Sequence, residues 1–89
     1  MSMESYLNHP TFGLLYRVCD LEETKELFAT LYAQRLFFRV TTDAMGVQFE
    51  PTSRADAKML IENRLRGLRR FGDTDAYNSL IVVYKQTFQ

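Results

Sequence analysis

The chain has 89 residues, which allows one compact domain or a small domain with an appendage. Its 11 basic and 11 acidic residues leave a formal net charge of zero, whereas a protein that mainly grips nucleic-acid phosphates carries surplus positive charge. The apolar runs are too short to cross a bilayer, and the first ten residues lack the pattern of a secretion signal. The single cysteine, Cys19, cannot form an internal disulfide, so we expect a cytoplasmic protein.

The charges divide the chain into two parts of opposite sign. Residues 1–53 hold seven acidic and four basic residues, a net charge of −3, and residues 54–89 hold seven basic and four acidic residues, a net charge of +3. The hydrophobic pattern also changes at 51–53. We therefore predict a β domain over residues 1–53 and a C-terminal helical hairpin over residues 54–89.

The beginning of the first part is typical of strands. The turn-forming residues 8–10 precede residues 12–18, in which aromatic and aliphatic side chains approximate the period of two expected of a strand. Residues 20–24 are polar and are predicted to form a connection.

The end of the first part predicts a β-hairpin. Residues 36–40 alternate as in a strand, residues 43–46 have turn composition, and residues 47–50 form a short final strand. Pro51 lacks a backbone N–H and is expected to end it.

Residues 22–38 are compatible with either helix or strands. The segment is rich in helix formers, Asp20 begins a possible capping box, and Leu27, Leu31 and Phe38 would share one helical face. Its aromatic and β-branched content is also consistent with strands. The residues alone leave the two structures equally favoured.

The second part predicts a helix from Ser53 to Gly72. Ser53 is a suitable N-cap, Asp56 lies near the positive end of the helix, and Gly72 supplies the left-handed residue that ends many helices. One apolar stripe recurs at helical spacing: Ala57, Leu60, Ile61, Leu65, Leu68 and Phe71.

A second helix is predicted after Gly72, with Asp73 or Thr74 as its cap. Residues 80–84 are rich in strand formers, but a connection this short favours an antiparallel helical hairpin. Strands followed by two helices make an α+β chain. The apolar stripe of this helix is Tyr77, Leu80, Ile81, Tyr84 and Phe88.

The residues indicate neither catalysis nor a metal or cofactor site. His9 is the only histidine, Cys19 lies among apolar neighbours as structural cysteines do, and the four glycines are too scattered to cradle a phosphate. A mechanism needs a nucleophile, a base and an orienting group, and no such set is present. We expect a protein that is not an enzyme.

A cluster of arginines and a dense aromatic segment remain as candidate binding features. Arg64, Arg66, Arg69 and Arg70 could bind phosphates or an acidic partner, although a solvated helix face is the more common meaning of such a pattern. Arg64 lies beside the apolar stripe and is expected to tuck against the sheet or a partner. Residues 31–38 crowd Tyr, Arg and large apolar side chains together, the types enriched at binding hot spots. The core of a small sheet would explain them equally well.

The sequence resembles the PipX family, small cyanobacterial PII-interacting proteins. The resemblance is carried by YLNHPTFGLLYR at 6–17, LYAQRLFF at 31–38, FEP at 49–51, ENRLR at 62–66, LRR at 68–70 and YKQTFQ at 84–89. It implies a five-stranded Tudor-like (SH3-like) antiparallel β domain followed by an antiparallel two-helix hairpin. Strands are then expected within residues 22–38.

The resemblance also implies a function in nitrogen signalling. Members of the family are adaptors, sequestered by the signalling protein PII when 2-oxoglutarate is scarce and freed to coactivate the transcription regulator NtcA when it is abundant. Both partners compete for one surface, and the hairpin is available to further regulators. Direct specific DNA binding is not expected. That surface corresponds here to Glu4, Tyr6, Tyr32, Gln34, Arg35, Leu36 and Phe38. A small SH3-like nucleic-acid-binding module is the alternative function.

Overall fold

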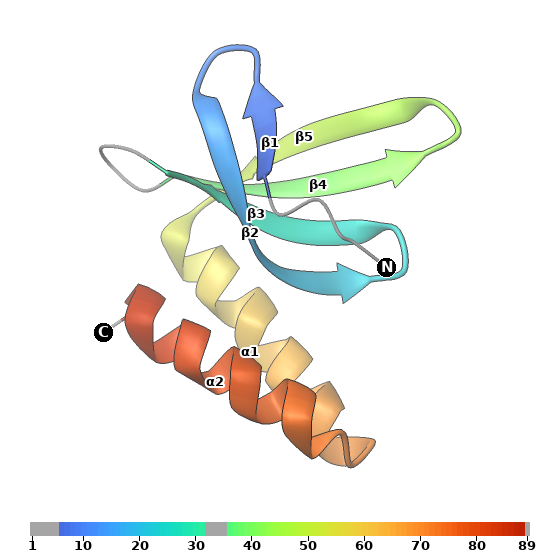
Figure 1. The fold of residues 1–89 in the computed structure, drawn as a ribbon, viewed down its shortest axis with the longest axis vertical. Coiled ribbons are helices and arrows are strands. Elements are labelled where there is room, and N and C mark those ends of the chain that lie inside the picture. Colours follow the sequence, from blue (N-terminus) through green and yellow to red (C-terminus); the bar gives the residue numbers. More distant parts are fainter. Residues whose placement is uncertain (1–5, 32–35, 89) are drawn as a thin grey trace.

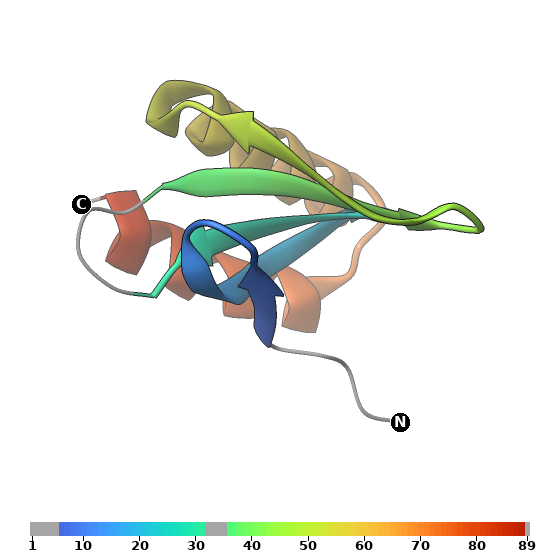
Figure 2. The same cartoon turned by 90° about the horizontal axis from the view of Figure 1, so that it is seen from above.

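A computed structural model describes residues 6–31 and 36–88. Within them, five antiparallel strands form one sheet in the order β1-β2-β3-β4-β5, and two helices follow, which confirms the predicted α+β fold. The sheet curls, and both helices lie on one side of it (Figure 1, Figure 2). The elements are β1 Tyr6–His9, β2 Gly13–Glu22, β3 Lys25–Thr30, β4 Phe37–Asp43, β5 Gly46–Thr52, α1 Arg54–Arg70 and α2 Thr74–Phe88.

The second strand is longer than the sequence pattern predicts. Phe12 belongs to the turn, and β2 begins at Gly13, whose φ of 78° favours glycine. The predicted connection at residues 20–24 is wrong for its first three residues, because β2 continues to Glu22, which pairs with Lys25. Two register shifts in β2 bend this strand and let its polar end remain paired. Polar composition is no obstacle to a strand at the exposed end of a hairpin.

The described residues of 22–38 contribute to strands, chiefly β3 and the start of β4, as the family resemblance implies. In β3, Leu27 and Ala29 belong to the core cluster that includes the helices, whereas Phe28 belongs to a second cluster on the opposite face. A single helix would bury one stripe of this segment. Pairing with β2 and β4 buries side chains on both faces of β3, and that long-range gain outweighs local helix propensity.

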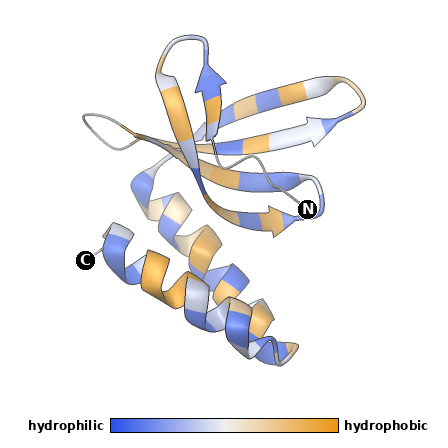
Figure 3. Ribbon diagram, viewed as in Figure 1, coloured by the Kyte–Doolittle hydropathy of each residue, from blue (hydrophilic) through white to orange (hydrophobic). Residues whose placement is uncertain are grey.

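The sheet is apolar on both of its faces. Hydrophobic and hydrophilic positions alternate along several strands (Figure 3), but the alternation separates two cores rather than a core from solvent. The core between sheet and helices contains Val18, Cys19, Leu27, Ala29, Phe37, Ala57, Ile61, Leu65, Leu68 and Leu80. The core on the opposite face contains Leu15, Phe28, Phe38 and Val40, with Leu7 and Phe49 packed against it.

The first helix begins and ends where its caps predict. The Ser53 side chain accepts a hydrogen bond from the Asp56 backbone N–H at 3.0 Å, and Gly72 follows the C-terminal cap with a φ of 75°. Ser53 is the residue between the last strand, β5, and the first helix, α1. The prediction that Phe71 shares the apolar stripe is wrong, because this residue is the C-cap and its side chain is 84% exposed.

The second helix is also confirmed, in preference to the strand that residues 80–84 could have formed. The Asp73 carboxylate accepts a hydrogen bond from the Ala76 backbone N–H at 3.2 Å and so caps the helix. Leu80 lies in the core against α1 and the sheet.

Polar and aromatic contacts fasten α2 along its length. The Tyr84 hydroxyl donates to the Glu62 carboxylate at 2.5 Å, and this hydrogen bond raises the pKa of Tyr84. Near the end of the helix, the Phe88 ring stacks on Phe37 of β4 with 5.6 Å between centroids. The Arg54 guanidinium also contacts the Phe88 ring, at 5.0 Å from its centroid. The end of α2 is therefore joined to the sheet through Phe37 and to the start of α1 through Arg54.

Truncating the centre of α1 should destabilise the whole protein. Ile61 is fully buried between the sheet and α2, whereas Met59, two residues away, is exposed. We expect Ile61→Ala to lower the free energy of unfolding by about 2–5 kcal/mol, through lost burial and the cavity left behind. Met59→Ala should change it by less than about 0.5 kcal/mol. Urea denaturation followed by circular dichroism measures both, and equal effects would contradict the assignment of the core.

Candidate partner-binding surface

The strand register brings the described candidate residues to neighbouring rows of the sheet. Tyr6 pairs with Tyr16, Tyr16 with Ala29, and Ala29 with Phe37, so Tyr6 and Phe37 occupy one row. Leu36 and Phe38 flank Phe37 in the chain. Tyr6 stands three strand spacings away, about 14 Å along that row. An edge strand and the start of β4 thus contribute to one end of the sheet.

The candidate residues differ in what they offer to a partner. The side chains of Tyr6 and Leu36 are 52% and 39% exposed and are available for contact. Phe38 is 2% exposed and belongs to the core on the sheet face opposite the helices, where its ring lies 5.5 Å from that of Phe12. The remaining four candidates, Glu4, Tyr32, Gln34 and Arg35, lie outside the described residues.

Exposed large hydrophobic residues lie at the start of β1, in the β1–β2 turn and at the two described ends of the β3–β4 connection. We call these four residues the partner surface: Tyr6, Phe12, Leu31 and Leu36. The sequence left two meanings open for residues 31–38, a sheet core or an interface. The described part of this segment contains core residues as well as exposed ones. Phe37 and Phe38 are buried, whereas Leu31 and Leu36 are exposed.

Two hydrogen bonds between Thr30 and Leu36 hold the ends of the β3–β4 connection together. The Thr30 backbone N–H donates to the Leu36 carbonyl at 2.9 Å, and the Leu36 N–H donates to the Thr30 hydroxyl at 2.9 Å. The Leu31 N–H also donates to the Leu14 carbonyl at 3.1 Å, which ties the same point to β2. Sequence reasoning missed Thr30, because a threonine at the end of a strand does not reveal a partner six residues away.

His9 organises the neighbouring β1–β2 turn. Its Nδ1 accepts hydrogen bonds from the backbone N–H groups of Thr11 and Phe12, at 3.0 and 3.2 Å, so the ring proton resides on Nε2. The ring centroid lies 4.8–5.0 Å from those of Phe12, Phe38 and Phe49. The only histidine of the chain therefore builds the turn that presents Phe12.

The structure gives contacts for three of the four arginines predicted as a cluster, Arg64, Arg66, Arg69 and Arg70. Arg64 reaches Asp20 on β2, with 3.4 Å between Nη2 and Oδ2, which confirms that it tucks against the sheet. Arg66 donates a hydrogen bond to Asn63, and the Arg69 guanidinium lies 5.7 Å from the centroid of the Tyr77 ring. Arg64 is thus engaged with the sheet, whereas Arg66, Arg69 and Arg70 stay neighbours at helical spacing on α1.

Cys19 is a buried structural cysteine. Burial raises the pKa of its thiol to about 12, and the neighbouring Asp20 carboxylate adds to the effect. Among the described residues, no group of three or more His, Cys, Asp or Glu side chains could hold a metal ion. None of the described helices has the length and apolar character needed to cross a membrane.

A small curled sheet backed by a helical hairpin places the chain among the small α+β modules. Exposed aromatic and aliphatic side chains of the kind found here are enriched where such modules bind other proteins. The PipX family model, PII-interacting protein X, matches residues 3–88. The chain belongs to this family and is a PII-interacting regulatory protein. A comparison with curated proteins gave no match.

Removing the Thr30 hydroxyl should loosen the β3–β4 connection. Thr30→Val keeps the shape of the side chain but leaves the part-buried Leu36 N–H without its acceptor, so we expect a loss of about 1 kcal/mol in the free energy of unfolding. Thr42→Val, at an exposed position of β4, is the matched control and should change stability by less than about 0.5 kcal/mol. Urea denaturation of both variants tests this, and a silent Thr30→Val would show that the hydrogen bond is dispensable.

The buried thiol of Cys19 should make stability fall in alkaline solution. The thiol of the unfolded chain ionises with its ordinary pKa of 9.0, whereas the folded thiol keeps its proton up to about 12. The neutral thiol therefore favours the folded state below pH 9, and this contribution is lost as pH rises from there toward 12. Cys19→Ala should show a shallower decline in the free energy of unfolding, measured by urea denaturation at pH values from about 8 to 10. Parallel declines in both proteins would refute the assignment.

Proposed function

We propose that this protein is a non-enzymatic, cytoplasmic adaptor of nitrogen signalling. PII sequesters it when 2-oxoglutarate is scarce, and it coactivates NtcA when 2-oxoglutarate is abundant. Both partners use an overlapping surface on the β domain, residues 1–53. The observation that carries this proposal is the match of the PII-interacting family over residues 3–88.

The exposed end of the sheet supports a protein-binding function. Tyr6 and Leu36 present aromatic and aliphatic area, and Leu36 directly follows residues 32–35 in the chain, which include Tyr32 and Arg35. Tyrosine and arginine are the residue types most enriched at binding hot spots. Thr30 fixes the end of this connection through two hydrogen bonds, which reduces the conformational entropy that binding costs.

Competition for one surface is sufficient to transmit the metabolite signal. If 2-oxoglutarate lowers the affinity of PII for the adaptor, more adaptor becomes free for NtcA. The adaptor itself need not change shape, because the metabolite acts through the difference in affinity between two states of PII. In this scheme the adaptor needs no cofactor of its own. The hairpin, residues 54–89, remains accessible to further regulators.

Binding to immobilised PII tests the proposal directly. The chain should bind PII in the presence of ADP and should dissociate as 2-oxoglutarate is raised in the presence of Mg-ATP. It should then bind NtcA in the same high-2-oxoglutarate buffer. Binding to PII that does not respond to 2-oxoglutarate would contradict the signalling role. Absence of binding to either protein would contradict the adaptor function as a whole.

Tyr32→Ala should weaken binding to both partners. A tyrosine at a hot spot contributes more than about 1 kcal/mol, which corresponds to an increase of more than about fivefold in Kd for PII and for NtcA. Tyr6→Ala, at the edge of the same surface, should have a smaller effect in the same direction. Met59→Ala, on the exposed face of α1, is the control and should leave both Kd values unchanged. A folded Tyr32→Ala variant with unchanged affinities would contradict the shared surface.

A further inference from the structure

His9 holds the β1–β2 turn through the unprotonated nitrogen of its ring. Its Nδ1 accepts hydrogen bonds from two successive backbone N–H groups, those of Thr11 and Phe12, at 3.0 and 3.2 Å. The side chain of Phe12 is 48% exposed and belongs to the partner surface. The turn that presents Phe12 therefore depends on an acceptor that exists only while the imidazole is neutral.

Three aromatic rings pack around the ring of His9. Phe12 of the turn, Phe38 of β4 and Phe49 of β5 have centroids 5.0, 4.9 and 4.8 Å from its own. The rings of Phe12 and Phe38 also contact each other, with 5.5 Å between centroids. The ring of His9 thus couples the turn to the core on the sheet face opposite the helices, to which Phe38 belongs.

The charged residues of β4 and β5 nearest to these rings lie on the other face of the sheet. Arg39 follows Phe38 in β4, and Glu50 follows Phe49 in β5, so each side chain points to the opposite face. The two pair with each other at 2.7 Å and line a groove against α1. Neither of them balances a charge on His9.

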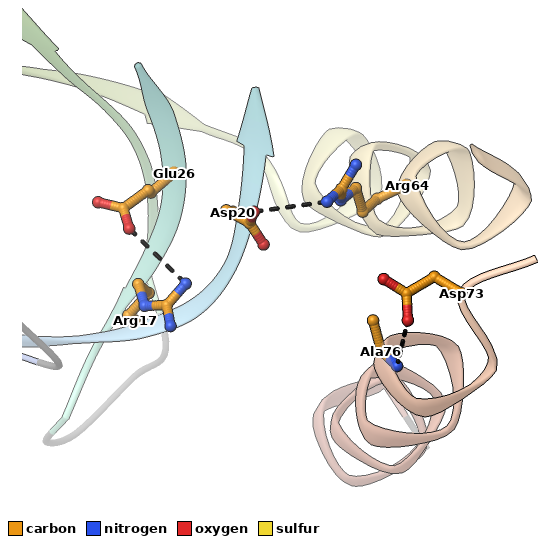
Figure 4. Close-up of polar contacts among 6 residues, drawn as sticks. All are labelled: Arg17, Asp20, Glu26, Arg64, Asp73 and Ala76. Atoms are coloured by element: carbon orange, nitrogen blue, oxygen red, sulfur yellow. Dashed lines mark hydrogen bonds and ion pairs between the residues drawn. The ribbon is translucent and has the colours of Figure 1, made fainter. Parts of the chain in front are cut away.

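The other strands near the turn also offer no counter-charge to His9. In β1, Tyr6 lies one position out of phase with His9 and so faces the other side of the sheet. On the face that His9 shares, Arg17 of β2 pairs with Glu26 of β3 at 3.6 Å (Figure 4). Within residues 6–31 and 36–88, the polar partners of the His9 ring are the two backbone N–H groups of the turn.

Protonation replaces the acceptor of His9 by a donor. An imidazolium carries a proton on both nitrogens, so Nδ1 would face the N–H groups of Thr11 and Phe12 donor to donor. Neither hydrogen bond survives this change. Both bonds lie at the exposed surface, where water can take over the two N–H groups. Histidine is the residue type whose side chain ordinarily changes charge between about pH 5 and 8.

We propose that His9 is a pH-sensitive positioning residue of the partner surface. Its protonation releases the β1–β2 turn and moves Phe12 away from Phe38, while the sheet and the hairpin stay folded. The release is local because the turn joins the ends of two strands, and the pairing of Tyr6 with Tyr16 lies beyond it. The neutral ring closes the turn, and the protonated ring opens it.

NMR titration of the free chain from about pH 8 to about pH 5.5 tests the proposal. At the upper limit, the ring nitrogen signals should show a bare Nδ1. As pH falls, the amide signals of Thr11 and Phe12 should follow the titration curve of the ring, and the contact between the Phe12 and Phe38 rings should be lost. The amide of Gly46, in the β4–β5 turn, should not follow this curve. A ring that titrates without moving the two amides, or that stays neutral to the lower limit, would overturn the proposal.

Two variants separate the acceptor from the ring. His9→Asn places an amide oxygen near the position of Nδ1 and does not titrate, so the turn should stay closed over the whole pH range. His9→Phe keeps an aromatic ring but has no acceptor, so the turn should be open at every pH. Amide signals of His9→Asn that move with pH as in the wild type would assign the change to another group and overturn the proposal.

The consequence for partner binding rests on the proposed function. Between about pH 8 and about pH 6, the Kd for PII should rise at least about fivefold more for the wild type than for His9→Asn, which corresponds to one ordinary hydrogen bond. Titration of PII itself cancels in this ratio. Equal rises would overturn the role of His9 in recognition. Absence of PII binding at both pH values would contradict the proposed function alone, because the titration of the free chain decides on the turn independently.

Discussion

The structure depends on a sheet that is apolar on both faces and therefore cannot stand alone in water. On one face, Leu27, Ala29 and Phe37 require a cover, and Ile61 and Leu65 of α1 supply it. A β domain of about 50 residues buries only a limited share of its own surface. The helix α1 is therefore a necessary part of the fold. The opposite face is closed by the curl of the sheet itself, around Phe28 and Phe38. The packing of the hairpin on the sheet rests on the first of these cores, and the β1–β2 turn that presents Phe12 rests on the second.

The backbone that presents the partner surface is held in place by buried side chains and hydrogen bonds. Phe38 fills the core beneath the start of β4, and its ring lies 4.9 Å from His9, which in turn holds the β1–β2 turn through two backbone hydrogen bonds. Thr30 closes the base of the β3–β4 connection. Exposed aromatic area is useful to a partner when the backbone that presents it is already ordered, since less entropy is then lost on binding. Under the proposed function, residues such as Phe38 and His9 would act by ordering the backbone that a partner meets.

The parts of the fold that the sequence predicts are those governed by local rules. Ser53 and Gly72 define α1 because a cap acts on its own helix, and the periodicity of 3.6 reveals which side is buried. The choice between helix and strands in residues 22–38 could not be made from local sequence. The strand β3 forms by pairing with β2 and β4, and β4 pairs in turn with β5. The family resemblance supplied that choice. The hydrogen bonds of Thr30 with Leu36 were not predicted, because they depend on how the chain returns from β3 to β4. The exposure of Phe71 was not predicted, because it depends on where α1 ends.

The opposite charges of the two parts do not hold them together. Among the described residues, the ion pair that joins the two parts, Arg64 with Asp20, spans 3.4 Å and is partly exposed, and pairs of this kind add little stability. Apolar contacts join sheet and hairpin instead. Most of the acidic charge of residues 1–53 and the basic charge of residues 54–89 thus stays in solvent. Charges left in solvent steer encounters, so partners of opposite sign are drawn to different parts of one small molecule.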